Sequence, residues 1–518
     1  MEIMDFQLIS KLILNIFLLM FIFCSIRIFY SVWWKPKSLE KYFRRIGVAG
    51  SSYRLFSGDL KEAKKLMSEA AAKPMTLSHD IVPRVQPYWD RMVREHGKIS
   101  GSWHGTTAQV VVADAAIIRQ ILNARDGSFQ KVPRNPLVKL LTLGVSTLEG
   151  RRWETRRKLV SPAFHHDKLL GMIPTFLTSC SNLVERLTNK IEGSSGNLEL
   201  DIAPEMHRLA SDIIARAAFG VSFEEAETIF KLQKEQAALV LDAASTVYFP
   251  GSRFLPTKRN RRMYEIDRAI KAKLRDMILE KERKIGNGEM GGDEDLLSLL
   301  LKSQKQSGND MTIDDVMEEC KLFYFAGQET TANWLMWTMI VLSMHPQWQE
   351  KAREEVLHVF GKKIPDVKTL NQLKIVSMIL QEVLRLYPSV PITVRHTHEA
   401  IKIRDKIIPP GVNLVLPTLL LHHNPVYWGE DAEEFKPDRF AEGVSKAGKD
   451  HDELAFYPFG WGPRICLGQN FAVMEAKLAL TMILQNFVFE LSPSYTHAPR
   501  AVLTLQPQYG APLILRKL

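Results

Sequence analysis

The segment from Phe459 to Gly468 contains the side chain best suited to ligate a metal, the thiol of Cys466. Glycines at 460, 462 and 468 allow tight turns and a close approach of the backbone to a flat ligand. A helix is expected from Gln469, so the free N–H groups of its first turn favour a thiolate at Cys466. Arg464 adds a cation that can meet a carboxylate. The alternative is a buried structural cysteine, the usual role of an isolated thiol.

A second candidate site is the sequence AGQETT at 326–331, inside a long apolar stretch. Ala326, Gly327 and Thr330 are three or four residues apart, so a helix places them on one face. Small residues leave room over a flat cofactor, and the Thr330 hydroxyl beside the Glu329 carboxyl can relay protons. Taken alone, the segment is equally typical of close helix packing.

Two further pairs combine charged or polar groups at helical spacing. Glu382 and Arg385 are three apart, and although such a pair is usually a weak surface contact, the apolar residues around it favour burial. A buried pair needs additional partners to offset its desolvation. Trp153 and Arg157 supply an indole N–H and a guanidinium, both donors to a carboxylate. That pattern also occurs in ordinary basic helices.

The elements that must position these residues are mostly helical. Apolar periodicity and stop residues predict helices over 314–344, 347–360, 373–387 and 469–487. Short apolar patches predict strands at 110–112, 401–403, 412–416 and 513–516, with 502–505 as an alternative strand. The polar segment 286–295 reads as an exposed connection. We therefore expect a mainly α fold with small β-sheets.

Composition bounds the class of protein. The chain has 518 residues, 46% of them hydrophobic, and no linker-like, low-complexity or repeated tract divides it, so one large domain is expected. Its net charge of +10 suits an anionic membrane surface or an acidic partner protein. No pattern typical of nucleic-acid binding accompanies that charge. The four cysteines are far apart, which fits a reducing compartment.

The N-terminus carries an almost uninterrupted apolar run from Leu12 to Ile26, followed by Trp33 and Trp34. The strict run is short for a span of roughly 20 residues, but it continues past Arg27, which can snorkel, and the tryptophans suit the membrane interface. Glu2 and Asp5 before the run and the lack of a small-residue cleavage motif after it favour one transmembrane helix over a cleaved signal peptide. Basic residues on the C-terminal flank place the main domain in the cytosol by the positive-inside rule. The expected organisation is a membrane anchor over 1–34, a basic linker over 35–50 and a catalytic domain over 51–518.

The cysteine segment matches FxxGxRxCxG at each fixed position, and this pattern resembles the haem-binding signature of the cytochrome P450 family. AGQETT resembles the family's oxygen-activation segment, and WxxxR at 153–157 and ExxR at 382–385 match two further family motifs. FYFAGQETT at 323–331 and GWGPRICLGQNFA at 460–472 are similar to the plant microsomal clan that includes secologanin synthase. The four motifs and the apolar N-terminus extend the resemblance over essentially the whole chain. In place of a proline-rich hinge after the apolar run stands Trp34-Lys35-Pro36.

The resemblance implies a role for each matched residue. Cys466 would be the axial thiolate of a haem b iron, in a loop that also supplies Phe459, Arg464 and Gly468. The haem propionates would bind Trp153, Arg157, Arg464 and Arg395. Thr330 would hold iron-bound oxygen and Glu329 would be the acid of the proton path. Arg439, from the segment FKPDRF at 435–440, would join Glu382 and Arg385 in a structural lock.

The resemblance also implies an activity and its partners. It predicts the P450 fold and a monooxygenase that uses dioxygen and electrons from an NADPH-cytochrome P450 reductase, held in the endoplasmic reticulum membrane. The substrate would be a hydrophobic small molecule, and a terpenoid is the expectation. Its pocket would be lined from 132–148, 239–254, 323–331 and 390–394. Two alternatives are a haem-thiolate isomerase or dehydratase, which usually lacks the acid–threonine pair, and an electron carrier, which would offer a second axial ligand.

Overall fold

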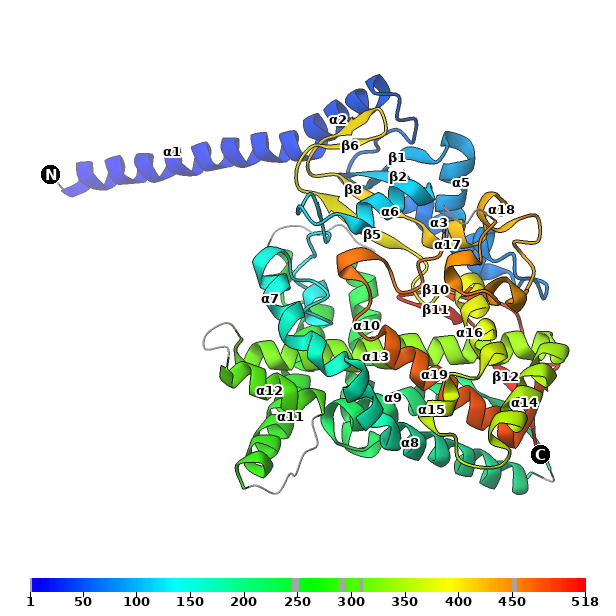
Figure 1. Ribbon diagram of the computed structural model, residues 1–518. Helices are drawn as coiled ribbons and strands as arrows, with labels where there is room; N and C mark the ends of the chain where they lie inside the picture. Colours follow the sequence, from blue (N-terminus) through cyan, green and yellow to red (C-terminus); the bar gives the residue numbers. More distant parts are fainter. Residues whose placement is uncertain (1, 195, 245–250, 288–294, 307–310, 450–453) are drawn as a thin grey trace.

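The computed structural model describes residues 2–194, 196–244, 251–287, 295–306, 311–449 and 454–518. Figure 1 shows a helical part crossed by the long helix α13 (Ile313–Met344), with a smaller part built around a β-sheet above it. The helix α1 (Glu2–Phe29) projects away from both parts. The expected class, mainly α with small sheets and an apolar N-terminal helix, is confirmed.

The other helices of the described residues lie on both sides of α13 in the sequence. Before α13 they are α2 (Lys35–Arg45), α3 (Leu60–Ala72), α4 (Val82–Val85), α5 (Pro87–His96), α6 (Ala115–Asn123), α7 (Gly150–Val160), α8 (His166–Glu192), α9 (Ala203–Phe219), α10 (Phe223–Ala244), α11 (Lys258–Gly286) and α12 (Leu296–Gln306). After it come α14 (Pro346–Phe360), α15 (Val367–Leu370), α16 (Lys374–Leu386), α17 (Thr418–His422), α18 (Pro425–Trp428) and α19 (Gln469–Asn486).

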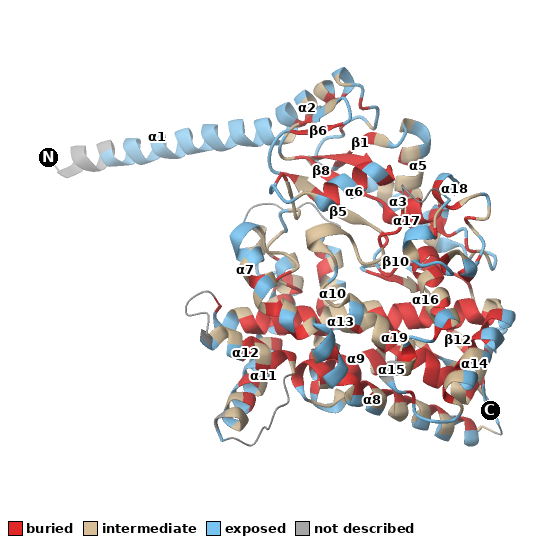
Figure 2. Ribbon diagram, viewed as in Figure 1, coloured by how far each residue is buried: buried red, intermediate tan, exposed pale blue. Residues whose placement is uncertain are grey.

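Helix α13 is the centre of the core. Thr312 caps its N-terminus by accepting a hydrogen bond from Asp315 N–H, and the Asp315 carboxylate accepts one from Thr312 N–H in return. The helix ends at His345, directly before Pro346, because the residue before a proline disfavours the helical conformation. It is apolar on most sides and packs against α9, α16 and α19, so most of its length is buried, as Figure 2 shows.

Within the part of the chain that the structure describes, four small sheets accompany the helices. The largest has the order β1 (Ile99–His104), β2 (Thr107–Val112), β8 (Asn413–Leu416), β5 (Thr393–Thr397) and β3 (Phe129–Gln130). Only β2 and β8 pair in parallel in this sheet. The others contain β4 (Asn197–Asp201), β12 (Pro512–Lys517) and β9 (Phe487–Leu491); β6 (Ile401–Ile403) and β7 (Lys406–Ile408); and β10 (Pro499–Ala501) and β11 (Leu505–Pro507).

The alternative strand at 502–505 is wrong at all but its last residue, Leu505, which begins β11. The segment 502–505 was expected to be extended, but 502–504 forms the turn between β10 and β11, with Val502 N–H donating to the Thr504 carbonyl at 3.1 Å. Apolar residues at a tight turn look like a short strand when only the pattern is considered. The predicted connection at 286–295 falls mostly outside the described residues.

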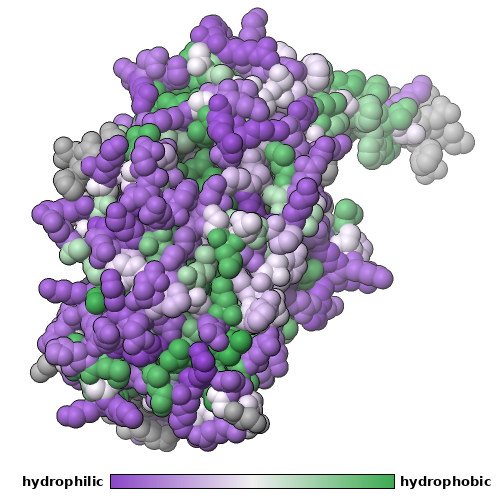
Figure 3. Space-filling view, turned by 90° about the vertical axis from the view of Figure 1, so that its right-hand side faces the viewer, coloured by the Kyte–Doolittle hydropathy of each residue, from purple (hydrophilic) through white to green (hydrophobic). Residues whose placement is uncertain are grey.

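The N-terminal helix has the length and composition of a membrane span. Its apolar stretch reaches a mean hydropathy of 2.5 over 18 residues, and none of that stretch is buried against the rest of the chain. Figure 3 shows it as an apolar projection from a largely polar surface. A short π-helical segment, Tyr30–Trp34, joins it to α2, whose Phe43 packs into the main core. The Tyr53 hydroxyl donates to the Val32 carbonyl at 2.5 Å.

Candidate active site

Cys466 lies in an irregular loop between a 3-10 turn, Gly462–Arg464, and the start of α19. Its N–H donates to the Phe459 carbonyl at 2.8 Å, which closes the loop. Gly462 has a φ of +67°, and an added Cβ would lie 2.3 Å from the Leu122 carbonyl oxygen. Only glycine fits there, so the glycine at this position of the motif lets the loop pack against the end of α6.

The loop and α13 enclose one cavity of about 340 Å³. Cys466 and Phe459 line one side, and Ala326, Gly327 and Thr330 line the other. The Thr330 hydroxyl donates to the Ala326 carbonyl at 2.7 Å, within its own helix. The structure thus brings the thiol and the small-residue face of α13, which are far apart in the sequence, onto facing walls of a single space.

The environment of the Cys466 thiol acts on its pKa in two directions. Crowding by protein raises the pKa above its ordinary value, although the thiol is exposed to the cavity. The Gly468 N–H and the Arg157 guanidinium act against that rise. The expected help from the helix start is therefore present but is outweighed by desolvation. A coordinated metal cation deprotonates such a thiol outright, so the site suits a metal-bound thiolate.

Positive side chains gather along one edge of the cavity. Arg157 donates to the Ile465 carbonyl at 2.9 Å, and Arg464 donates to the Leu148 carbonyl at 2.8 Å. The Arg464 guanidinium also stacks 3.9 Å from the centroid of the Trp153 ring and pairs with Glu149. These contacts hold the predicted propionate-binding groups around the cysteine loop.

Arg395 and Lys131 extend the same edge. Burial and the nearby Arg464 lower the pKa of Arg395 to about 10, and burial with Arg395 and Arg464 lowers the pKa of Lys131 to about 7. Of the described residues that line the cavity, four are cationic and none is acidic. A ligand that carries carboxylates would relieve this repulsion, so the donor set fits a haem with its two propionates. Lys131 was missed because no motif marks it.

Glu329 does not line the cavity, although its neighbour Thr330 does. Its carboxylate accepts hydrogen bonds from the Thr504 hydroxyl at 2.9 Å and the Asn333 amide at 3.2 Å. Its second oxygen lies 3.9 Å from His207 Nδ1. The acid and the alcohol are adjacent in sequence, as expected, but the carboxylate is turned toward the turn after β10. A part in proton transfer requires it to reorient or to act through a bridging group.

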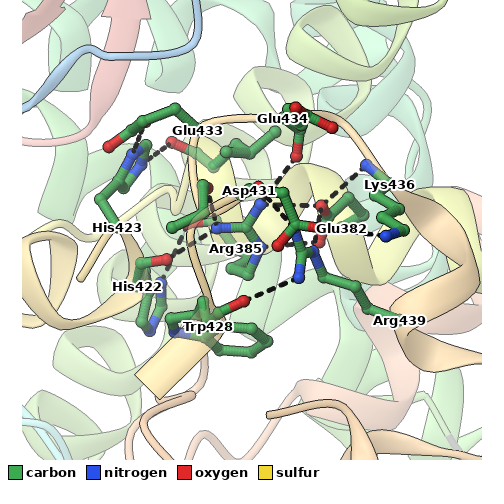
Figure 4. A network of polar contacts seen from close by, with 12 residues as sticks. Glu382, Arg385, His422, His423, Trp428, Asp431, Glu433, Glu434, Lys436 and Arg439 are labelled. Carbon is green, nitrogen blue, oxygen red and sulfur yellow. Dashed lines mark hydrogen bonds and ion pairs between the residues drawn. The ribbon is translucent and has the colours of Figure 1, made fainter. Parts of the chain in front are cut away.

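Glu382 and Arg385 form a fully buried ion pair, shown in Figure 4, with two nitrogen–oxygen contacts of 2.7 and 2.8 Å. Arg385 also donates to the carbonyls of His422 and Ala432, at 2.8 and 2.7 Å. Arg439 joins as the third member, with its Nε 3.5 Å from a Glu382 oxygen. These additional partners are what a desolvated ion pair requires.

Arg439 fixes the adjoining segment as well. It donates to the Trp428 carbonyl at 2.8 Å and pairs with Asp431 at 2.7 Å. Although partial burial opposes it, Lys436 and Arg439 lower the pKa of Asp431 to about 2. The network therefore links α16 to the chain that leads to the cysteine loop (Figure 4). None of its members is among the described residues that line the cavity.

Three of the four predicted pocket segments contribute to the cavity. Val145 and Ser146 come from 132–148, and Val390 and Thr393 come from 390–394. The segment 323–331 of α13 contributes Phe323, Ala326, Gly327, Thr330 and Thr331. The fourth, 239–254, lies partly outside the described residues, and its described residues do not line this cavity. Ile214 and Leu322 add apolar surface that the sequence did not single out.

Comparison with known proteins agrees with this geometry. Residues 83–510 match the model of the family described as Cytochrome P450. The chain is 50% identical to Cytochrome P450 CYP72A219 of Panax ginseng over 95% of this chain and 96% of that relative. It is 47% identical to Cytochrome P450 72A13 of Arabidopsis thaliana, over 94% and 95% of the two chains. It is 45% identical to 7-deoxyloganic acid hydroxylase of Catharanthus roseus, over 98% and 99%.

Proposed function

The chain belongs to the cytochrome P450 family and is one of its plant monooxygenases, and from this premise we propose that it oxidises a terpenoid or a hormone derived from one. The observation that carries the proposal is a cavity with Cys466 on one wall and Ala326, Gly327 and Thr330 on the other. When bound, haem supplies the iron at which dioxygen takes up two electrons and two protons, so that one oxygen atom enters a C–H bond and the other leaves as water.

The side chains of this protein bind the haem, orient oxygen, supply protons and support the cysteine loop. Cys466 gives the thiolate ligand, and Trp153, Arg157, Arg395, Arg464 and Lys131 hold the propionates. Thr330 orients oxygen and water by its hydroxyl. Glu329 does not line the cavity, and it supplies protons after its carboxylate turns away from Thr504 or through a bridging group. Phe459 and Gly468 shape the loop around the sulphur. Glu382, Arg385 and Arg439 brace that loop from behind and touch no reacting atom.

Support for a terpenoid comes from the cavity wall and from a relative. Part of the cavity is walled by apolar side chains, Leu322 and Phe323 of α13 together with Val145 and Val390. The similarity to 7-deoxyloganic acid hydroxylase covers nearly the whole of both chains. A rigid apolar skeleton with few polar groups is the ligand that such a wall accommodates.

We propose further that residues 1–34 anchor the protein in the endoplasmic reticulum membrane as a single span. The domain 51–518 then lies in the cytosol, joined through 35–50, and receives electrons from an NADPH-cytochrome P450 reductase. The long exposed apolar helix and the basic residues after it support this topology. The net charge of +10 supports docking of an acidic partner.

The test is metabolite profiling of microsomes that contain this chain and a reductase, supplied with a terpenoid panel that includes 7-deoxyloganic acid. We expect a product heavier by one oxygen atom, which carries the label when the reaction runs under oxygen-18 gas. An isomerised or dehydrated product without label would contradict the monooxygenase assignment. Oxidation of apolar compounds of other classes with no activity on any terpenoid would contradict the substrate class.

A further inference from the structure

The segment 144–148, here termed the partition, separates the cavity of Cys466 from a second cavity. Val145 and Ser146 line the inner cavity, whereas Gly144, Thr147 and Leu148 line an outer one of about 760 Å³. The outer cavity is also bounded by α7 and by the start of α13. Because neighbouring residues of the partition face opposite cavities, the wall between them is a single chain thick. A displacement of this chain would join the two spaces.

A fully buried carboxylate fastens the partition to α13. Glu319 Oε2 accepts a hydrogen bond from the Val145 N–H at 3.1 Å, and Oε1 accepts one from Arg156 at 3.0 Å. Arg156 in turn pairs with Asp315 at 3.0 Å. The carboxylate of Glu319 therefore connects α13, α7 and the backbone of a residue that lines the inner cavity.

Gly144 packs closely against the Glu319 carboxylate. Gly144 has a φ of +89°, and a Cβ added to it would lie 2.6 Å from the Glu319 carboxylate. A side chain at 144 would be strained by the backbone and would displace the carboxylate as well. Glycine at this position thus permits the close approach on which the hydrogen bond to Val145 depends.

The strength of this fastening depends on pH. Burial raises the pKa of Glu319 to about 7, while the Val145 N–H and Arg156 oppose the rise and Asp315 adds to it. The charged or titratable groups that face it are Arg156 from α7 and, on its own helix, Asp315 and the Cys320 thiol. Above pH 7 the ionised carboxylate makes charge-assisted bonds to the Val145 N–H and to Arg156. Below pH 7 protonation weakens both bonds and leaves Asp315 as the counter-charge of Arg156.

We propose that Glu319 is a positioning residue that holds the partition closed between the two cavities and so limits how fast small ligands reach the iron from the outer cavity. The proposal rests on the haem site described above, because the partition lines the same space as Cys466. It concerns access to that site and adds no group to the chemistry.

Carbon monoxide tests the proposal without a substrate. After flash photolysis of the reduced carbon monoxide complex, the bimolecular rebinding rate of the wild type should rise several-fold as pH falls from 8.5 to 6. The variant Glu319→Gln should rebind rapidly at every pH. Glu318→Gln is the matched control, because this neighbouring buried carboxylate pairs with Lys271 and Lys321 instead. Its pH profile should follow the wild type. A flat wild-type profile, or a pH-dependent Glu319→Gln, would overturn the proposal.

Hydrogen exchange provides a readout that does not depend on the iron. At pH 8, where Glu319 is ionised, peptides covering 144–148 should exchange at least several-fold faster in Glu319→Gln than in the wild type or Glu318→Gln. Unchanged exchange in Glu319→Gln would show that Glu319 does not hold the partition in place, even if the protein is an active monooxygenase. Faster exchange would support it even if no terpenoid is oxidised, so the two proposals fail separately.

Discussion

Thr330 and Cys466 contribute different properties to the cavity that they line. The sulphur is crowded by protein and has a raised pKa, so a bound metal cation is what makes it an anion. The Thr330 hydroxyl already has an acceptor, the Ala326 carbonyl, and keeps its lone pairs available to a group in the cavity. The two residues should therefore respond to mutation in different ways, one through metal binding and the other through the use of electrons.

For Thr330→Ala we expect normal haem binding and a loss of coupling. Removal of one positioned hydroxyl from such a site should lower product formed per NADPH by roughly tenfold or more, with a matching rise in peroxide. Thr338→Ala is the control, because its hydroxyl makes the same intrahelical bond to Trp334 in a buried part of α13 away from the cavity. Product and peroxide assays check both variants, and coupling unchanged in Thr330→Ala would remove its assigned role.

For single residues, the sequence predicted which side chains lie close together wherever they are near neighbours in the chain. Cys466 and Arg464 are two residues apart, so any fold of the loop keeps them close. The direction of Glu329 could not be predicted, because its partner Thr504 comes from a turn 175 residues away. Lys131 belongs to no local pattern, and it reaches the cavity edge only because the chain before α7 folds back beside Arg395 and Arg464.

Among the elements, α16 carries the ion pair that secures the segment before the cysteine loop. In Glu382→Gln the guanidinium of Arg385 would stay buried without its counter-charge, which costs about 3–5 kcal/mol when one member of a buried pair is removed. We expect a lower free energy of unfolding by that order, together with partial loss of haem. Chemical denaturation and haem content measure the two effects.

The matched comparison is Glu280→Gln on α11, where an exposed pair with Lys284 at 2.8 Å has the helical i, i+4 spacing. Exposed ion pairs contribute little to stability, so the free energy of unfolding of this variant should equal that of the wild type. Equal stability of both variants would show that the network of Figure 4 does not brace the fold.

A buried histidine cluster joins α13 and α16 to the N-terminal region and should make the fold acid-sensitive. His79 Nε2 lies 2.8 Å from His345 Nε2, and His79 Nδ1 lies 2.9 Å from the Tyr387 hydroxyl. Burial lowers the pKa of His79 to about 3 and that of His497 to about 4. Folded pKa values below the unfolded value of about 6.5 mean that the unfolded chain binds more protons, so stability falls as pH drops below 6.5.

The free energy of unfolding of the wild type should fall between pH 6.5 and pH 4.5. In His79→Gln the fall should be smaller by about 2 kcal/mol, because this one titrating group is absent. Denaturant unfolding at the two pH values measures the difference. Parallel losses in the two proteins would mean that His79 is not held neutral in the fold.

Element prediction succeeded for the four helices and the strands that a clear apolar pattern marked, whereas the long helices α8, α9, α10 and α11 were not predicted. The helix 314–344 was predicted within one residue of α13, because capping residues and Pro346 mark its ends. The short strands β10 and β11 were not predicted, because β10 packs beside α4 and β11 beside α13, and these contacts are not visible in their own three residues. Neither the partition nor its contact with Glu319 has a signature in the sequence.

For the whole molecule, α1 should determine whether the protein is recovered with membranes. Deletion of residues 1–34 removes the apolar stretch, so a larger share of the chain should appear in the soluble fraction after fractionation. Replacing Leu18 and Leu19 together by arginine keeps the length but should weaken insertion by about 2.5–3.5 kcal/mol for each charge. A wild-type chain that is fully soluble would contradict the anchor.

The central claim is that Cys466 is the thiolate ligand of a haem iron, and the carbon monoxide difference spectrum of the reduced protein tests it most directly. The wild type should show the red-shifted Soret band of thiolate ligation, and Cys466→Ser should lose it while Cys180→Ser, at a buried cysteine outside the cavity, keeps it. A wild type without this band, or a Cys466→Ser protein that retains it, would contradict the claim.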